Sequence, residues 1–230
     1  MEDDVATETG RDRRAERRRR SVALAGHNGD QAAARRGLAD PDPRVRATAV
    51  GALARLGELT VADVVGALAD EAPAVRRRAA DAAPLVRGRG SRSTLPAALV
   101  ATLADPDPLV VVGAAWFAGE RRNRPAVPAL AITATGHDDT RCREAAVAAL
   151  GAIGDPAGLA AVLAALDDRP TVRRRATVAL AGFDDPRVGP ALRRAAEDRD
   201  WQVRQAAEEL LGEDGGAAAP RPAAPPTRPG

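Results

Sequence analysis

The sequence predicts an all-α, right-handed α-α solenoid of six helix pairs that follow an N-terminal capping helix. The first observation behind this prediction is a stretch that starts at Asp40 and reads DPDPRVRATAVGAL, which returns in altered form about every 31 residues. The altered copies begin at Asp70, Asp105, His137, Asp167 and Asp198. A fixed period in this range is typical of stacked structural units, each of which contacts only its neighbours.

The second observation is that two columns of small or apolar residues recur in register. An apolar anchor stands five residues after the start of each copy: Val45, Val75, Val110, Cys142, Val172 and Val203. Four residues later every copy has alanine: Ala49, Ala79, Ala114, Ala146, Ala176 and Ala207. An invariant alanine indicates the place where neighbouring helices approach most closely, at about 8–10 Å.

The chain is expected to begin with a disordered segment, residues 1–11, and a half repeat, residues 12–29. The five residues from Val22 to Gly26 are identical to those from Val178 to Gly182, which close a second helix. We therefore expect residues 12–25 to form the second helix of an incomplete repeat. Such a half repeat, with a charged outer face, covers the first full unit of a solenoid.

Each full repeat contains two helices joined by a turn rich in Asp and Pro. The expected repeats are 30–59, 60–93, 94–124, 125–155, 156–185 and 186–213. Pro suits the first helical position and Asp suits the N-cap, so second helices are expected to begin where these residues stand. The expected first helices are 30–39, 60–69, 94–104, 125–135, 156–166 and 186–196. The expected second helices are 43–56, 73–86, 108–119, 139–152, 170–182 and 200–211.

Two segments do not fit the repeat. Residues 87–93 (RGRGSRS) are expected to form an exposed loop, and residues 214–230, rich in Pro and Ala, a disordered tail.

The composition excludes or disfavours several classes of function. The chain has 34 Lys and Arg, all of them Arg, against 32 acidic residues, so the net charge is only +2 and nucleic acid is disfavoured as a partner. The single Cys142 excludes an intramolecular disulfide and a cysteine-based zinc cluster. No apolar run reaches about 18 residues and no secretory signal is recognisable. We expect a cytoplasmic protein with no membrane contact and no cofactor.

The recurring pattern D-x-D-P-x-V-R-x-x-A-x-x-A-L resembles HEAT repeats, in particular the short HEAT-like repeats named after phycobilisome lyases, within the wider armadillo-like group. The resemblance covers residues 30–212. It implies the solenoid fold specifically but no particular activity, because the group includes scaffolds, lyase subunits and a di-iron hydroxylase.

Two charged columns accompany the anchors. An Arg follows the anchor in five copies, and an Asp stands five residues before it in five copies. The members are Asp40, Arg46, Asp70, Arg76, Asp105, Arg143, Asp167, Arg173, Asp198 and Arg204. The third copy has Val111 in the Arg column, and the fourth has His137 in the Asp column. We interpret the columns as a structural ladder of Asp–Arg pairs between successive repeats, in preference to a ligand site.

The sequence disfavours three enzymatic hypotheses. The resemblance implies His-Glu dipeptides for the di-iron hydroxylase, but the equivalent place holds Arg143-Glu144, and His27 and His137 stand in separate turns. Bilin-lyase activity is disfavoured because the sequence gives no sign of an aromatic-lined pocket. A glycosylase for alkylated DNA would need a cationic concave face, which the near-neutral charge disfavours. The chain is therefore predicted to be a non-enzyme, with an accessory subunit or enzyme of these kinds as the alternative.

The predicted binding surface is the concave face. Residues two and six after the anchor fall opposite the buried side of the second helix, at about 100° per residue. They place Val112 and Trp116 at the centre, and tryptophan is common in interface hot spots. The predicted partner-binding residues are Trp116, Val112, Arg77, Arg174 and Glu144. The expected function is a scaffold or adaptor that binds a protein partner, such as an acidic or amphipathic segment. The alternative is that Trp116 packs under the 87–93 loop.

Overall fold

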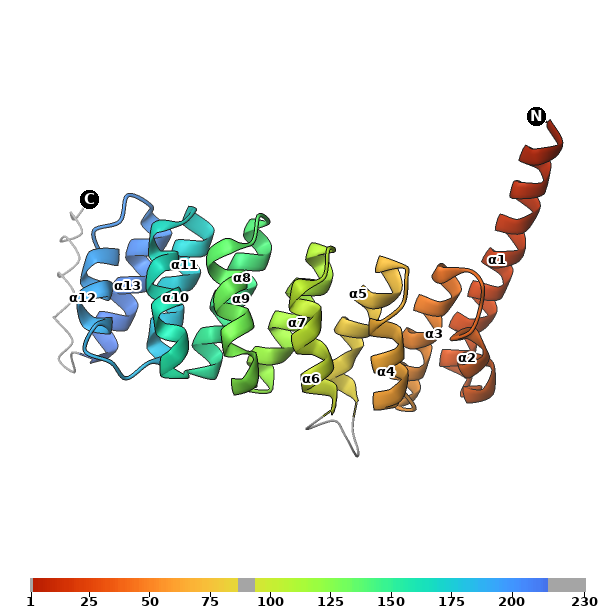
Figure 1. Ribbon diagram of the computed structural model, residues 1–230, viewed down its shortest axis with the longest axis horizontal. Coiled ribbons are helices and arrows are strands. Elements are labelled where there is room, and N and C mark those ends of the chain that lie inside the picture. Colours follow the sequence, from red (N-terminus) through yellow and green to blue (C-terminus); the bar gives the residue numbers. More distant parts are fainter. Residues whose placement is uncertain (1, 87–93, 215–230) are drawn as a thin grey trace, which may run out of the picture.

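The computed structural model describes residues 2–86 and 94–214 (Figure 1). Within these residues it contains thirteen α-helices, several short 3-10 turns and no strand. The loop predicted over residues 87–93 and, apart from Asp214, the tail predicted over residues 214–230 lie outside this description. None of the described helices is both long enough and apolar enough to cross a bilayer.

The helices follow the predicted alternation of first and second helices. The chain starts with the capping helix α1 (Glu2–Asn28). The first helices of the repeats are α2 (Gln31–Gly37), α4 (Val61–Leu68), α6 (Thr94–Ala101), α8 (Val127–Gly136), α10 (Leu159–Ala164) and α12 (Val188–Ala195). The second helices are α3 (Pro43–Leu56), α5 (Pro73–Ala82), α7 (Pro108–Glu120), α9 (Thr140–Ile153), α11 (Pro170–Ala179) and α13 (Trp201–Asp214).

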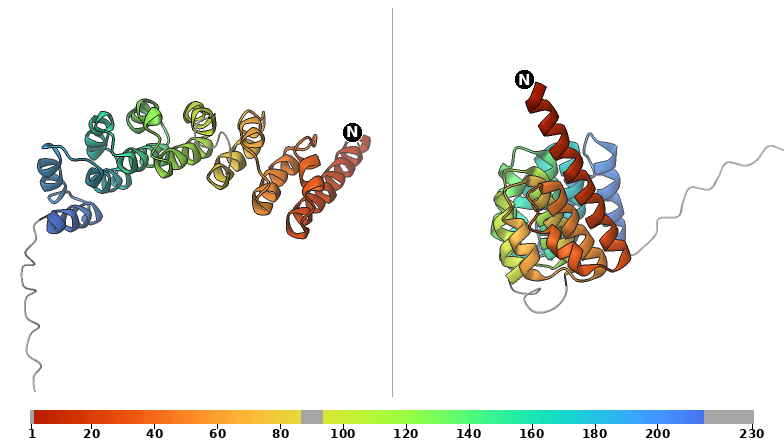
Figure 2. Two further views of the ribbon diagram at one scale, coloured as in Figure 1. Left: turned by 90° about the horizontal axis from the view of Figure 1, so that it is seen from below. Right: turned by 90° about the vertical axis from the view of Figure 1, so that its right-hand side faces the viewer.

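The helices form two rows that bend into an arc. The second helices pack side by side, each against the next, and α1 heads this row by packing on α3. Figure 2 shows that this row lies on the inner, concave side of the arc, whereas the first helices form the outer row. The concave face is therefore built almost entirely from one helix of each repeat.

The main core lies between the two rows and includes buried residues from Val22 to Leu192, and Ala195, Val203 and Ala207 form a second, small cluster in the last repeat. All six anchors and all six alanines of the invariant column are essentially inaccessible to solvent. Phe117 on α7 is the largest fully buried side chain. Fold and core thus follow the repeat pattern, as predicted.

Polar residues in the turns start the inner helices. The carboxylates of Asp42, Asp107 and Asp139 accept a hydrogen bond from the backbone N–H two residues later. Gly57 and Gly154 end α3 and α9 at φ of +74° and +66°, a left-handed conformation that disfavours any side chain.

The N-terminus differs from the prediction. Helix α1 begins at Glu2 rather than near residue 12, so residues 2–11 are helical and not disordered. It extends beyond the edge of the solenoid, as Figure 1 shows. At the other end α13 reaches Asp214, one residue beyond the predicted end of the solenoid.

Candidate functional site: a groove on the concave face

The turns of successive repeats are joined by arginine–carboxylate pairs. Arg46 donates through Nε and Nη2 to the carboxylate of Asp70 at 2.8 Å, and Arg76 binds Asp105 in the same two-pronged way at 2.7 and 2.9 Å. The remaining nitrogen, Nη1, donates to backbone carbonyls of the arginine's own turn, at Asp40 and Asp70 respectively. Each guanidinium therefore holds its own turn and the next repeat at once.

The ladder differs from the predicted set at three positions. Arg143 pairs with Asp168, not Asp167, at 2.6 and 2.8 Å. Asp167 is exposed and contacts Arg194 instead. The reason is that the turn before Val172 is one residue shorter, so the carboxylate stands four residues before the anchor rather than five.

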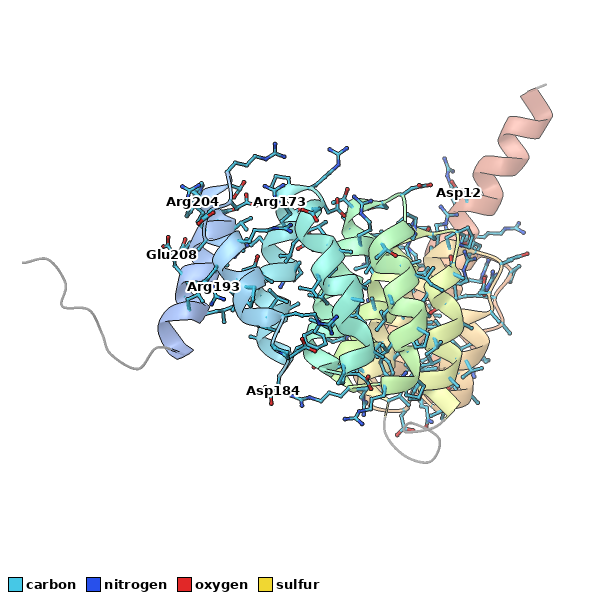
Figure 3. The ribbon with its side chains drawn as sticks, turned by 60° about the vertical axis from the view of Figure 1, so that its left-hand side comes forward. Asp12, Arg173, Asp184, Arg193, Arg204 and Glu208 are labelled. Atoms are coloured by element: carbon cyan, nitrogen blue, oxygen red, sulfur yellow. The ribbon has the colours of Figure 1, made fainter. Side chains whose placement is uncertain are left out.

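The two ends of the ladder supply the other differences. Arg204 lies in the last repeat that the structure describes, and its Nη1 donates to the carbonyl of Asp198 at 2.8 Å. At the first rung Asp40 binds Arg18 of the cap at 2.7 Å, a partner that the repeat pattern did not indicate. In Figure 3, Arg173 and Arg204 lie at the same edge of the solenoid, and Asp184 lies at the opposite edge.

These contacts keep the ladder carboxylates ionised. The guanidinium of Arg46 lowers the pKa of Asp70 below its ordinary value, and Arg173 does the same for Asp198. Arg18 and Arg143 likewise lower the pKa of Asp40 and Asp168. Burial opposes each shift, but the charged hydrogen bond dominates.

The ladder is interrupted between the third and fourth repeats, next to the centre of the concave face. Val111 is fully buried where the other repeats have arginine. The matching acceptor is also missing, because His137 occupies its place. The imidazole Nδ1 of His137 nevertheless accepts from the N–H of Asp139 at 3.0 Å, as the carboxylates do in their turns. The loss of Arg and the loss of Asp therefore belong to one altered interface.

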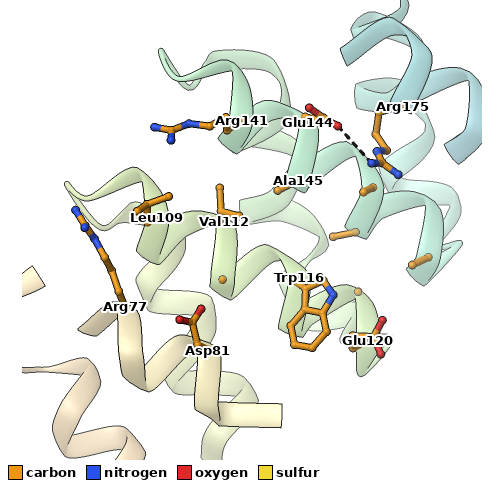
Figure 4. Close-up of a pocket in the computed structure, with 15 residues that line it drawn as sticks. Arg77, Asp81, Leu109, Val112, Trp116, Glu120, Arg141, Glu144, Ala145 and Arg175 are labelled. Atoms are coloured by element: carbon orange, nitrogen blue, oxygen red, sulfur yellow. Dashed lines mark hydrogen bonds and ion pairs between the residues drawn. The ribbon is translucent and has the colours of Figure 1, made fainter. Parts of the chain in front are cut away.

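A groove of about 760 Å³ lies on the concave face at this interruption (Figure 4). Its centre is Trp116 on α7, whose surface is 52% exposed, beside Leu109, which is 40% exposed. Val112 lies between them along the same face of α7, and Ala145 and three further alanines of α9 complete the apolar lining. An exposed tryptophan in a hollow has the geometry of an interface anchor.

Charged residues surround this apolar centre. Three are basic and three acidic, namely Arg77, Arg141, Arg175, Asp81, Glu120 and Glu144. Arg77 is held by the buried carboxylate of Asp107 on the next repeat. Arg175 reaches Glu144 at 3.3 Å, the ion pair that is dashed in Figure 4. The rim is thus balanced in charge.

Four of the five predicted partner-binding residues line this groove: Trp116, Val112, Arg77 and Glu144. Arg174 does not; it is exposed on α11, and its neighbour Arg175 lines the groove instead. The reason is the direction in which equivalent side chains point from their helices. Residues three after the anchor reach back to the preceding inner helix, as Arg175 does toward Glu144.

The same geometry explains which lining residues the sequence reasoning missed. Leu109 and Arg141 stand one residue before the anchor, and Gly113, Ala145 and Arg175 stand three after it. At about 100° per residue these columns lie beside those at two and six, so a wider stripe would have included them. As for the 87–93 loop, those residues are outside the described part of the chain.

The described residues bring together no group of three or more His, Cys, Asp or Glu side chains that could hold a metal ion. His27 lies in the last turn of helix α1, not in a connecting turn as predicted, and His137 directly follows α8, so the two histidines belong to different units. Cys142 is buried, its thiol donates to the carbonyl of Pro108 at 3.3 Å, and burial raises its pKa to about 11. It packs as an anchor residue rather than as a nucleophile.

Comparison with known proteins assigns the family. The model for HEAT repeats matches residues 95–178 and 160–222, together more than half of the chain, and a further HEAT repeat model matches residues 34–59. The chain belongs to the HEAT-repeat proteins. No curated protein matches the sequence significantly.

Solved structures share the fold. The YibA protein of Escherichia coli is 21% identical over 78% of this chain and 68% of its own, with a TM-score of 0.60. A chain of the CpcE–CpcF complex of phycocyanin lyase from Nostoc sp. is 25% identical over 79% of this chain and 76% of its own, with a TM-score of 0.57. A designed armadillo repeat protein in complex with the peptide (KR)4 is 18% identical over 76% and 95%, with a TM-score of 0.58.

Proposed function

We propose that this protein is a non-catalytic scaffold that binds a partner protein in the groove around Trp116. The observation that carries the proposal is the exposed Trp116, which stands with Leu109 and Val112 in a hollow of the concave face. Burial of apolar surface is the main favourable term in most protein association, and exposed tryptophan offers more of it than any other side chain. The solenoid supplies an extended surface beside this anchor.

The interruption of the ladder supports this location. The third repeat replaces a polar rung by Val111 and adds Trp116 five residues later on the same helix. Among the described residues of the inner row, only α7 and the N-terminus of α13 carry a tryptophan. Trp201 at that N-terminus is 62% exposed but lies in the last repeat and does not line the central groove.

The test is purification of partners with tagged protein from its native host. We expect a partner that is recovered with the wild-type chain and lost, by about 30-fold or more in affinity, with Trp116→Ala. The matched control is Ile132→Ala, which removes a side chain that is 73% exposed on the outer helix α8. Thermal melting checks that both variants are folded. Equal recovery of the partner by Trp116→Ala and wild type would contradict the proposal.

The second candidate is an accessory subunit of the bilin-lyase kind, for which the likeness to the CpcE–CpcF complex is the specific observation. That complex pairs two different chains, so this candidate also involves a protein partner. It differs in requiring contact with a tetrapyrrole. Mixing the purified chain with free phycocyanobilin separates the two, because a shift of the bilin absorption band that Trp116→Ala removes would favour the lyase subunit.

A further inference from the structure

A second hollow adjoins the Trp116 groove on its N-terminal side. It has a volume of about 460 Å³ and lies across α1, α3 and α5. The two hollows share Arg77 and Asp81, so they adjoin each other at helix α5 on the concave face. The charged lining of the second hollow is strongly biased, with Arg19, Arg55, Arg77 and Arg78 against the single acid Asp81.

Two of these arginines are already neutralised. Arg19 forms a two-pronged pair with Glu16 at 2.7 and 2.9 Å, and Arg77 binds Asp107. For Arg55 and Arg78, no carboxylate of the described side chains lies within salt-bridge distance. Both side chains are exposed. Against the charges of Arg55 and Arg78 the lining has only Asp81, so the hollow keeps a net positive charge.

Both arginines rest on glycines of the preceding inner helix. A Cβ atom built on Gly51 would lie 2.5 Å from Nη2 of Arg78, and one built on Gly26 would lie 3.0 Å from Nη1 of Arg55. The guanidinium groups thus lie directly against the α3 and α1 backbones, where any larger residue would displace them. Both cations are thus exposed to solvent while they lie against the inner helices of the concave face.

We infer that the partner segment is bipartite, with an apolar side chain against Trp116 and carboxylates over Arg78 and Arg55. This inference rests on the proposed function and specifies its ligand. Neighbouring inner helices are about 10 Å apart, so the carboxylates lie roughly 10–20 Å from the apolar anchor. An extended chain spans that distance with about three to six residues at about 3.3 Å each.

Charge complementarity selects this occupant. The Trp116 groove has a balanced rim, whereas the adjoining hollow has two cations without partners, so acidic residues are favoured on one side of the anchor only. A carboxylate would form a charge-assisted, two-pronged pair with each guanidinium. A basic or neutral extension would leave both cations as they are and gain nothing from this hollow.

The test measures fluorescence anisotropy of labelled synthetic peptides with the full chain. The first probe has two leucines, a spacer of about four Gly and Ser residues and then about four glutamates. The second probe has glutamine in place of glutamate. We expect the glutamate probe to bind at least tenfold more tightly, and the difference to shrink as salt screens the charges.

The deciding variant is Arg55→Gln/Arg78→Gln. We expect it to weaken binding of the glutamate probe by about tenfold and to leave the glutamine probe unchanged, since two exposed ion pairs together contribute only modestly to affinity. The control with the same change of charge is Arg36→Gln/Arg193→Gln, two exposed arginines of the outer helices α2 and α12. The control should bind both probes as the wild type does.

The outcomes separate this inference from the proposed function. If Trp116→Ala weakens both probes but Arg55→Gln/Arg78→Gln weakens neither, the scaffold proposal stands and the bipartite ligand is wrong. If Trp116→Ala binds both probes as tightly as the wild type does, the proposed function of the groove and the bipartite ligand are both wrong. A single-stranded oligonucleotide that binds more tightly than the glutamate probe, and loses affinity in the double variant, would overturn the inference in favour of nucleic acid.

Discussion

At the scale of residues, the recurring Asp and Arg side chains join successive repeats. How much each pair contributes to stability depends on how deeply it is buried. Arg76 and Asp105 retain only 12% and 8% of their side-chain exposure. Desolvation offsets much of the attraction in such a pair, so the pair specifies register more than it adds stability. Removing only one partner is costly, because a charge is then left without its counterpart.

Arg76→Ala is therefore expected to destabilise the protein by about 2–3 kcal/mol, since it strands the carboxylate of Asp105. Arg204→Ala is the matched control, because Arg204 binds only carbonyls of its own turn and should cost about 0.5–1 kcal/mol. Urea denaturation followed by circular dichroism measures both. Equal losses in the two variants would show that the pairs between repeats have no special weight.

At the scale of elements, the junction of α7 with α9 is the place where the repeat pattern changes. Val111 is buried against it, and His137 maintains the turn before α9 through its Nδ1. The junction has thus exchanged an ion pair for apolar packing, while the turn hydrogen bond that the other repeats make through Asp is kept by His137. A buried ion pair and well-packed apolar residues often contribute similarly to stability, so this exchange need not lower the free energy of unfolding.

A double-mutant cycle tests whether the two exchanges belong together. Val111→Arg alone should destabilise by about 3 kcal/mol or more, because it places an unpaired cation in the core. His137→Asp alone should also destabilise the protein, because the Arg column offers the new carboxylate Val111 instead of a guanidinium, although it can still accept the bond from the N–H of Asp139. The double variant should be more stable, by at least about 1 kcal/mol, than the sum of the two single losses predicts. Additive losses, measured by urea denaturation, would contradict the pairing of positions 111 and 137.

At the scale of the whole molecule, the ladder runs along one edge of the solenoid and makes stability depend on acid. The folded-state pKa values of Asp40, Asp70, Asp168 and Asp198 are lowered by their arginines. For a lowered pKa, the contribution to stability is complete above the unfolded value of about 4 and is lost as pH falls toward the folded value.

We therefore expect the free energy of unfolding to vary little between about pH 5 and pH 8 through these groups, and to fall progressively below about pH 4. Urea midpoints across this range measure the effect. Asp198→Asn removes one contributor, so its stability should be lower at neutral pH and should fall less steeply in acid. An equal midpoint for the wild type at pH 3 and pH 6 would contradict this account.

The repeat period, the anchors and the alanine column were predictable from the sequence because they depend on local helix geometry and on one interface that every repeat shares. The N-caps were predictable for the same reason, because each lies within its own turn. The special character of the third repeat was also visible, since Val111 and Trp116 depart from columns that the other copies define.

Only the tertiary structure decided how these residues meet. The pairing of Arg143 with Asp168 depends on the length of one turn, and the pairing of Arg18 with Asp40 depends on where α1 packs. The groove includes Arg175 rather than Arg174 because the direction of a side chain depends on the rotation between neighbouring helices. A periodic pattern specifies that units stack, but the small rotation and shift at each junction determine which side chains share the concave face.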